Sequence, residues 1–132
     1  MSEMEGGCLC GVVRYRVKGT PMASVICHCT SCRKASGAPS VAWVTFPAAQ
    51  FEWVRGEPRS HRSSTPVLRT FCDRCGTPLT YANASRPQEI DVTTLSLDDP
   101  TLFPPRQEVW MQERVVWEAA NPSLRPFPRG GA

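Results

Sequence analysis

Apolar and polar residues alternate along short stretches of the chain, and proline or glycine interrupts the pattern every several residues. The clearest alternation covers residues 12–17, where Val13, Tyr15 and Val17 would lie on one face of a strand and two arginines on the other. Similar patterns predict further strands over residues 22–29, 41–46, 51–54, 67–71, 77–81 and 90–95. The chain is therefore expected to be mostly β, with many turns.

Three other segments give weaker signals. Residues 30–37 are polar and end in Ser36-Gly37, which predicts a loop or a single helical turn. Residues 110–117 fit a strand or a helix. The last twelve residues contain three prolines and two glycines, so we expect an irregular or frayed tail. A length of 132 residues suits one domain, which we place at residues 4–120, followed by the tail at residues 121–132.

Charge and hydropathy narrow the class of protein. The net charge is +3, and basic and acidic residues are mixed along the chain, so neither nucleic acid nor a membrane surface is expected as a partner. No apolar run reaches the length of a membrane span, and the first residues, MSEMEGGCLC, lack the pattern of a signal peptide. We therefore expect a cytoplasmic protein, whose reduced cysteines bind metal or act in catalysis rather than form disulfides. The oligomeric state stays open.

Seven cysteines form three clusters with short spacings. They are C-x-C at Cys8 and Cys10, C-x-C-x-x-C at Cys27, Cys29 and Cys32, and C-x-x-C at Cys72 and Cys75. Neighbouring thiolates at such spacings can converge on one metal ion, whereas disulfides usually join distant segments. Zinc takes about four protein ligands in a structural site, and about three in a catalytic site that keeps an open position. A total of seven suggests one closed and one open zinc site, hence two ions per chain.

The first and last clusters supply the four ligands of the closed site. If Cys8 and Cys10 lie in a strand, both sulfurs point to the same face. Cys72 and Cys75 precede Gly76, as in a zinc knuckle, where a positive φ at the glycine leaves backbone N–H groups free to donate to sulfur. The two ligand spacings argue against the alternative that these are ordinary core cysteines.

The middle cluster, Cys27, Cys29 and Cys32, supplies three ligands and leaves a fourth position for water or a substrate. In an extended segment His28 would point away from the sulfurs, so we expect it to be packed or hydrogen-bonded, with ligation by His28 as the alternative. Because sulfur is a soft ligand, the open position suits another thiolate.

Arg33 and Lys34 follow this cluster directly. They either offset the charge of three thiolates and contact the carboxylates of an anionic thiol, or are solvated surface charges. Four aromatic residues between the second and third clusters are interpreted as core rather than as walls of a pocket: Trp43, Phe46, Phe51 and Trp53. His61 is expected in an exposed polar loop, and Asp98-Asp99 before Pro100 predicts a turn.

The runs GGCLCGVVRY, CHCTSCRKASGA, FCDRCGTPLTY and LSLDDP resemble the glutathione-dependent formaldehyde-activating enzyme family, which includes centromere protein V. The resemblance extends over residues 6–117 and implies an all-β, Mss4-like, zinc-stabilised fold. It further implies a structural zinc at Cys8, Cys10, Cys72 and Cys75, and a catalytic zinc at Cys27, Cys29 and Cys32.

The activity that this resemblance implies is a zinc-dependent carbon–sulfur lyase of the S-hydroxymethylglutathione synthase type. Such an enzyme adds glutathione to formaldehyde or cleaves the adduct, and the carboxylates of glutathione would then contact Arg33 and Lys34. Two alternatives stay open. One is a non-enzymatic, zinc-stabilised binding module, and the other is a thiol-redox or metal sensor whose three-cysteine cluster loses zinc on oxidation.

Overall fold

The structure is a computed structural model that describes residues 2–130. Its strands and single α-helix are, in chain order within those residues, β1 (Glu3–Gly7), β2 (Arg14–Lys18), β3 (Ala23–Cys27), α1 (Thr30–Ser36), β4 (Val41–Pro47), β5 (Phe51–Arg55), β6 (Arg59–Ser64), β7 (Val67–Phe71), β8 (Pro78–Asn83), β9 (Glu89–Thr93), β10 (Gln107–Val109) and β11 (Arg125–Pro126). Four short 3₁₀ turns accompany them in the same part of the chain: η1 (Ala48–Gln50), η2 (Thr94–Ser96), η3 (Pro100–Leu102) and η4 (Met111–Glu113).

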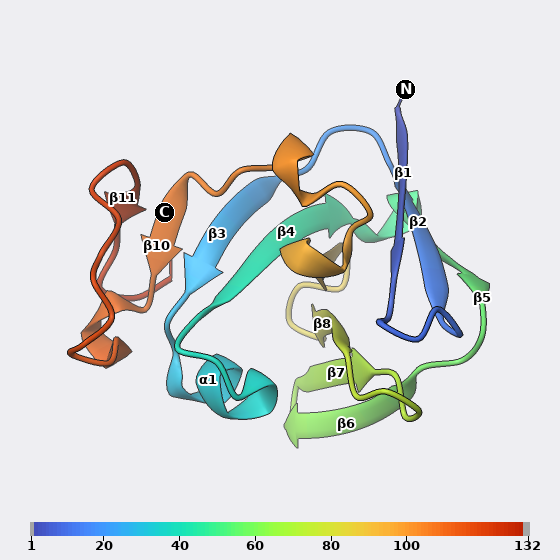
Figure 1. The fold of residues 1–132 in the computed structure, drawn as a ribbon, viewed down its shortest axis with the longest axis horizontal. Helices are drawn as coiled ribbons and strands as arrows, with labels where there is room; N and C mark the ends of the chain where they lie inside the picture. The colour runs from blue at the N-terminus through green and yellow to red at the C-terminus, as the bar shows by residue number, and fades with distance from the viewer. Residues whose placement is uncertain (1, 131–132) are drawn as a thin grey trace.

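The strands of the described chain form two sheets (Figure 1). The smaller sheet has the order β1-β2-β5, and the larger sheet has the order β11-β10-β3-β4-β9-β8-β7-β6. Neighbouring strands are antiparallel except at β10, which runs parallel to both β3 and β11. The expected class, a mostly β single domain of the Mss4-like type, is confirmed.

The hydrophobic core lies where the two sheets meet. Val13, Tyr15 and Val17 have exposed fractions of 2%, 0% and 0%, so the predicted apolar face of β2 is confirmed. The larger sheet contributes four fully buried side chains to the same cluster: Val44, Phe46, Leu79 and Val92. Full burial of each such side chain contributes about 1.5–3 kcal/mol, so this cluster is a main source of stability.

Strand β4 separates this core from the opposite face of the larger sheet. Because successive side chains of a strand point to opposite faces, Val44 and Phe46 enter the core while Trp43 and Thr45 face away from it. All four are buried, since both faces of β4 are covered. Functional side chains can therefore lie on one face without disturbing the packing on the other.

Residues 30–36 form helix α1 rather than a loop or a single turn. The sulfur of Cys29 caps the helix by accepting a hydrogen bond from the Cys32 N–H at 3.2 Å. Gly37 ends it at φ 67°, and its N–H donates to the Arg33 carbonyl. Helices usually begin after Ser, Thr, Asp or Asn, so a cysteine cap gives no start signal that sequence reading can use.

Two further segments differ from expectation. Residues 59–64 form the edge strand β6, whereas a polar loop was expected around His61. All of its side chains are exposed, so no alternation marks it, and pairing with β7 holds it in place. Residues 110–117 form neither a strand nor a long helix but the 3₁₀ turn η4 and irregular backbone.

The described part of the C-terminal segment is mostly irregular, which is one of the two alternatives expected, but it is attached to the larger sheet rather than frayed. Strand β11 pairs with β10, and the backbone N–H groups of residues 110–112 donate to carbonyls of residues 127–129. Residues 131–132 lie outside the described residues.

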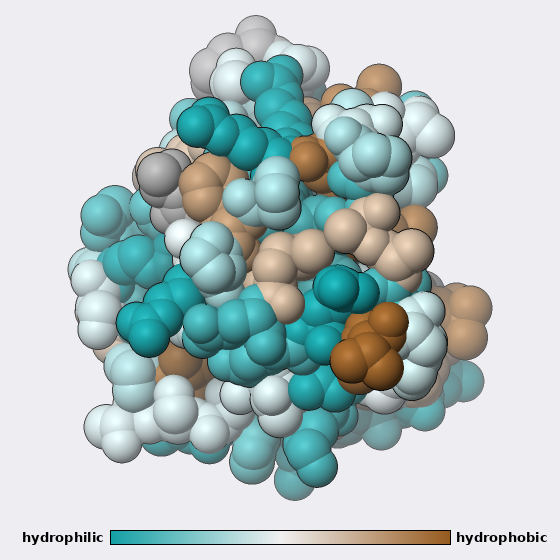
Figure 2. All heavy atoms as spheres, turned by 90° about the vertical axis from the view of Figure 1, so that its left-hand side faces the viewer, coloured by the Kyte–Doolittle hydropathy of each residue, from teal (hydrophilic) through white to brown (hydrophobic). Residues whose placement is uncertain are grey.

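The surface on the left of Figure 1 is mostly hydrophilic, and apolar atoms are scattered over it in small groups (Figure 2). Among residues 2–130, helices that combine the length and apolar character of a membrane span are absent.

We predict that Gly6→Ala destabilises the domain. A Cβ at this position would lie 2.5 Å from Tyr15 Oη and 2.6 Å from the Ser96 carbonyl oxygen. Overpacking of this kind costs about 1–3 kcal/mol, so the melting temperature should fall by about 5 °C or more. Gly130→Ala is the control, because nothing lies within 4 Å of a Cβ there. Circular dichroism melts that coincide for both variants would contradict the close packing of β1 on Tyr15.

Candidate metal centres and the adjoining cavity

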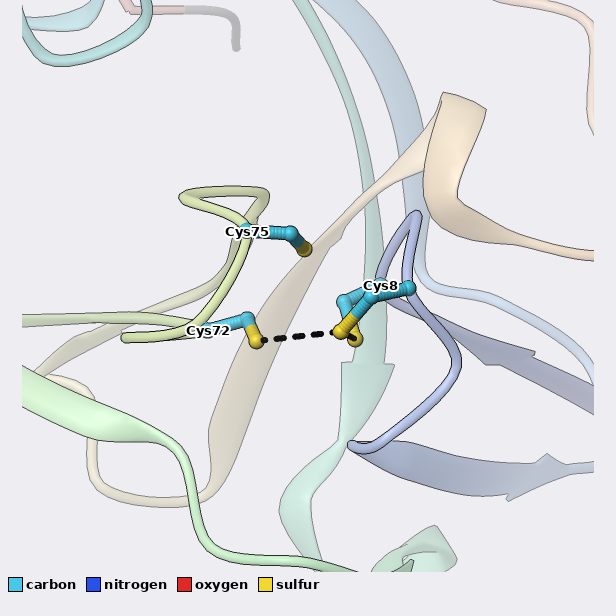
Figure 3. A group of neighbouring side chains, drawn as sticks. Cys8, Cys72 and Cys75 are labelled. Carbon is cyan, nitrogen blue, oxygen red and sulfur yellow. Dashed lines mark hydrogen bonds between the residues drawn. The ribbon is translucent and has the colours of Figure 1, made fainter.

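The first and last cysteine clusters come together between two turns. Cys8 and Cys10 lie in the turn between β1 and β2, and Cys72 and Cys75 lie in the turn between β7 and β8. Figure 3 shows the labelled side chains of Cys8, Cys72 and Cys75 pointing toward one another from these turns. All four sulfurs lie within 4.8 Å of one another, so the two clusters form one four-sulfur cluster.

Sulfur separations in this cluster fit a tetrahedral metal site. The Cys8 and Cys10 sulfurs are 3.6 Å apart, and those of Cys10 and Cys72 are 3.8 Å apart. A disulfide requires about 2.0 Å, whereas four sulfurs bound to zinc at about 2.3 Å in a tetrahedron lie about 3.8 Å apart. The donor set and its geometry are therefore compatible with zinc.

Strand geometry is not what brings Cys8 and Cys10 together. They lie in a turn that the Gly11 N–H closes by donating to the Cys8 carbonyl at 3.0 Å, and the Leu9 side chain is 88% exposed. The two sulfurs converge as expected, but the strand assumed for them is wrong. The Val13 N–H, at 3.3 Å from the Cys8 sulfur, further fixes this turn.

The second turn has the predicted knuckle geometry. Gly76 has φ 84°, and the Arg74 N–H donates to the Cys72 sulfur at 3.4 Å. The Thr77 hydroxyl lies 3.2 Å from the Cys75 sulfur and also accepts the Leu9 N–H at 3.0 Å, so it links the two turns. Hydrogen bonds from Thr77 lower the pKa of Cys75 to about 5, which favours the thiolate that a metal requires.

The middle cluster forms at the junction of β3 and α1. Cys27 ends β3, Cys29 caps α1 and Cys32 lies within its first turn, and their sulfurs are within 4.8 Å of one another. Hydrogen bonds from the other two thiols lower the pKa of Cys29 to about 2, and the Cys29 thiolate in turn raises the pKa of Cys27. Three sulfurs at this spacing are a soft donor set that suits the same metals as the first cluster.

His28 points away from these sulfurs, in agreement with the hydrogen-bonded histidine that the sequence analysis favoured. Its imidazole donates to Glu108 Oε1 at 2.8 Å, and the two side chains are 1% and 3% exposed. The other carboxylate oxygen of Glu108 accepts the Asn121 N–H at 2.8 Å. The segment that carries the sulfurs is thus fixed to β10 and to the C-terminal segment through one buried carboxylate.

A cavity of about 760 Å³ adjoins the three-sulfur cluster. Its walls include all three sulfur-bearing residues, the aromatic side chains of Trp43, Tyr81 and Trp110, and charged groups of both signs. The charged residues are Arg69, Arg86, Arg106, Glu89, Asp91 and Glu113. Among the described residues that line it, Arg33 and Lys34 are absent: they lie on α1, where the Arg33 guanidinium donates to the Thr30 hydroxyl at 3.1 Å.

Arg69 of β7 is the functional candidate that sequence reading missed. Its two terminal guanidinium nitrogens lie 3.9 and 3.8 Å from the Cys32 sulfur. Residues 67–71 read only as an apolar strand, and no motif links Arg69 to a cysteine 37 positions away. The long-range strand pairing of the larger sheet is what brings them together.

Most of the aromatic and acidic residues singled out in the sequence take part in packing or in turns, and Trp43 is the exception because it lines the cavity. Phe46 is fully buried in the core, and Phe51 and Trp53 pack on Tyr15 in the smaller sheet. Trp43 is also buried, but it forms a wall of the cavity. Asp98 forms two hydrogen bonds with the Arg14 guanidinium, and the Asp99 side chain caps η3.

These observations describe a small β domain with two cysteine clusters that can each bind a metal ion. Residues 3–113 match the family model of the glutathione-dependent formaldehyde-activating enzyme. The chain belongs to this family, so the resemblance found in the sequence is confirmed.

Two curated relatives and one solved structure are similar to this chain. A Halomonas elongata protein named "Putative glutathione-dependent formaldehyde-activating enzyme" is 28% identical over 125 residues, which cover 86% of this chain and 78% of the relative. A Schizosaccharomyces pombe protein named "Uncharacterized lyase" is 32% identical over 95 residues, which cover 69% and 67%. A crystal structure of a Rhodobacter sphaeroides protein matches with a TM-score of 0.62 at 27% identity, covering 72% of this chain and 88% of that one.

We predict that the two clusters lose metal at different chelator concentrations. Four sulfurs from two separate turns would supply all four ligands of a tetrahedral ion, whereas three sulfurs beside a cavity would leave one position open to exchange. Native mass spectrometry of the zinc-loaded protein, titrated with a mild chelator, should show a folded species that has lost one ion before the second ion is lost. Simultaneous loss of both ions together with unfolding would contradict the division into four and three ligands.

Proposed function

We propose that this protein is a zinc-dependent carbon–sulfur lyase that joins a thiol to formaldehyde and cleaves the adduct, as an S-hydroxymethylglutathione synthase does. The four-sulfur cluster holds a structural zinc in this proposal, and Cys27, Cys29 and Cys32 hold a catalytic zinc. The observation that carries it is that the three-sulfur cluster adjoins a cavity of about 760 Å³, within the size range of small-molecule sites.

The number and kind of donors support these roles. When bound, a zinc ion with three sulfur ligands supplies a positive centre that keeps a ligand thiol ionised and a fourth position at which that thiol can bind. Trp43, Tyr81 and Trp110 supply apolar wall beside this position. These side chains cover part of the reacting position, and removal of water there would strengthen electrostatic interactions.

Charged walls of the cavity suit a zwitterionic thiol such as glutathione, which has two carboxylates and one ammonium group. The Arg106 guanidinium has no ion-pair partner among the described residues and is free to bind a carboxylate. Arg86 is already paired with Glu89 at 2.8 Å. Asp91 accepts a hydrogen bond from the Thr45 hydroxyl and keeps a second carboxylate oxygen for an ammonium group. We therefore assign the ligand carboxylate to Arg106 rather than to Arg33 or Lys34.

Matched cysteine variants test the two roles. Cys72→Ser removes a sulfur from a cluster that joins residues 62 positions apart in the chain, so the melting temperature should fall by about 10 °C or more. Cys29→Ser makes the same chemical change at the three-sulfur cluster and should shift the melting temperature by less than about 3 °C while lowering turnover at least about 100-fold. Circular dichroism melts and turnover assays measure both effects. Equal destabilisation would show that both clusters are structural.

We expect glutathione to bind at the three-sulfur cluster with release of a proton at neutral pH. A free thiol, with a pKa of about 8.5, is mostly protonated at pH 7, whereas a metal-bound thiol is ionised. Isothermal titration calorimetry in buffers of different ionisation enthalpy measures the proton directly. S-methylglutathione carries the same charges but no ionisable thiol, so it should bind at least about tenfold more weakly and release no proton.

Equal affinity for the two compounds would place the thiol away from the metal. No binding of either compound at millimolar concentration would remove glutathione as the substrate and favour the non-enzymatic binding module.

A further inference from the structure

Arg69 is held in one place by groups from three other elements. Its Nε–H donates to the Ser63 hydroxyl of β6 at 3.1 Å, and its guanidinium lies over the Tyr81 ring of β8, 5.0 Å from the ring centre. Its two terminal nitrogens face the Cys32 sulfur of α1 at 3.9 and 3.8 Å. A guanidinium fixed at Nε and at its face can present its terminal N–H groups in one direction without further ordering.

The terminal N–H groups are not used up by these contacts. Arginine has five N–H donors, of which one is taken by Ser63. The contacts with the Cys32 sulfur are long, so hydrogens on both terminal nitrogens stay available to a stronger acceptor, such as an oxygen in the cavity. Arginine also stays charged at all pH values at which the protein is folded, so its role needs no titration.

We propose that Arg69 is a further catalytic residue that donates hydrogen bonds to the carbonyl oxygen of the aldehyde. This inference rests on the proposed lyase function. In the forward direction the substrate thiolate adds to the carbonyl carbon, a carbon–sulfur bond forms, and the π electrons of the carbonyl move to its oxygen. Arg69 stabilises the negative charge that develops there. A proton from water then completes the hydroxymethyl thioether and replaces the proton that the thiol lost on ionisation.

The other cations of the site are placed less well for this role. Arg86 is engaged by Glu89, and among the described residues Arg106 makes no hydrogen bond to a sulfur of the cluster. Arg33 and Lys34 do not belong to the described cavity walls. Among the described residues, Arg69 is the cation that both lines the cavity and contacts a proposed zinc ligand, so its donors lie beside the position at which the thiolate would react.

Substitution of Arg69 should therefore affect the aldehyde step and not thiol binding. Loss of one oxyanion donor lowers kcat by about 10²–10³, so Arg69→Met should lower kcat by at least about 100-fold. Arg69→Lys keeps the charge but not the fork of N–H donors, so its kcat should lie between that of Arg69→Met and that of the natural protein. Glutathione affinity by calorimetry and zinc content by mass spectrometry should change by less than about threefold for both variants.

Two controls separate catalysis from structure. Arg62→Met changes an exposed arginine of the neighbouring strand β6, which donates to the Thr65 carbonyl, and should leave turnover unchanged. For Arg69→Ala, added guanidinium ion should restore part of the turnover, whereas ammonium should not, because the fork of donors is what is missing. Exchange NMR with ¹³C-formaldehyde measures turnover after the rate without protein is subtracted.

The possible outcomes distinguish a failure of the role proposed for Arg69 from a failure of the lyase function on which that role rests. Turnover of Arg69→Met within threefold of the natural protein, or a loss of glutathione affinity or zinc that accounts for all lost turnover, overturns the role of Arg69 alone. Failure of guanidinium to restore any turnover to a folded, zinc-loaded Arg69→Ala also counts against it. A natural protein that holds two zinc ions and does not accelerate exchange overturns the proposed lyase function itself.

Discussion

Convergence of four sulfurs between two turns is the constraint on which the rest of the structure depends. One turn belongs to the smaller sheet and the other to the larger sheet, so a metal ion at this cluster would fix the two sheets to each other. The Thr77 hydroxyl reinforces the connection by contacting both Leu9 and Cys75. Closing a long segment of chain is entropically costly, and metal binding offsets this cost with folding free energy. Cys8 and Cys72 of this cluster also pack in the core that includes Tyr15, to which both sheets contribute.

The larger sheet keeps stability and chemistry on opposite faces. Val44 and Phe46 of β4 fill the core, whereas Trp43 of the same strand forms a wall of the cavity. The three-sulfur cluster lies at the end of β3 and in α1, outside the main core. Because the cavity and the three-sulfur cluster lie on the face of the sheet opposite the core, a ligand can bind there without disturbing the packing of the two sheets.

Local patterns predicted what depends on local geometry, and failed where pairing between distant segments decides. The alternation around Tyr15 predicted β2, and the spacing of the cysteines predicted both clusters. For Arg33 and Lys34 the sequence left two alternatives open, contact with a ligand or a solvated surface position, and spacing alone could not decide between them because the face of α1 that lines the cavity depends on how the helix packs. Arg69 reaches Cys32 through strand pairing instead, which no spacing in the sequence encodes.

One wall of the cavity is held by residues beyond the range that matches the family model. Trp110 lines the cavity with φ 59°, a left-handed conformation that bulky side chains rarely adopt. Backbone hydrogen bonds from residues 110–112 to residues 127–129 hold this turn in place, and the family match ends at residue 113. The family match thus covers both cysteine clusters, whereas residues 127–129, which hold the Trp110 turn, lie beyond it. Because these contacts maintain the strained backbone of Trp110, the C-terminal segment helps to shape the wall of the cavity that Trp110 forms.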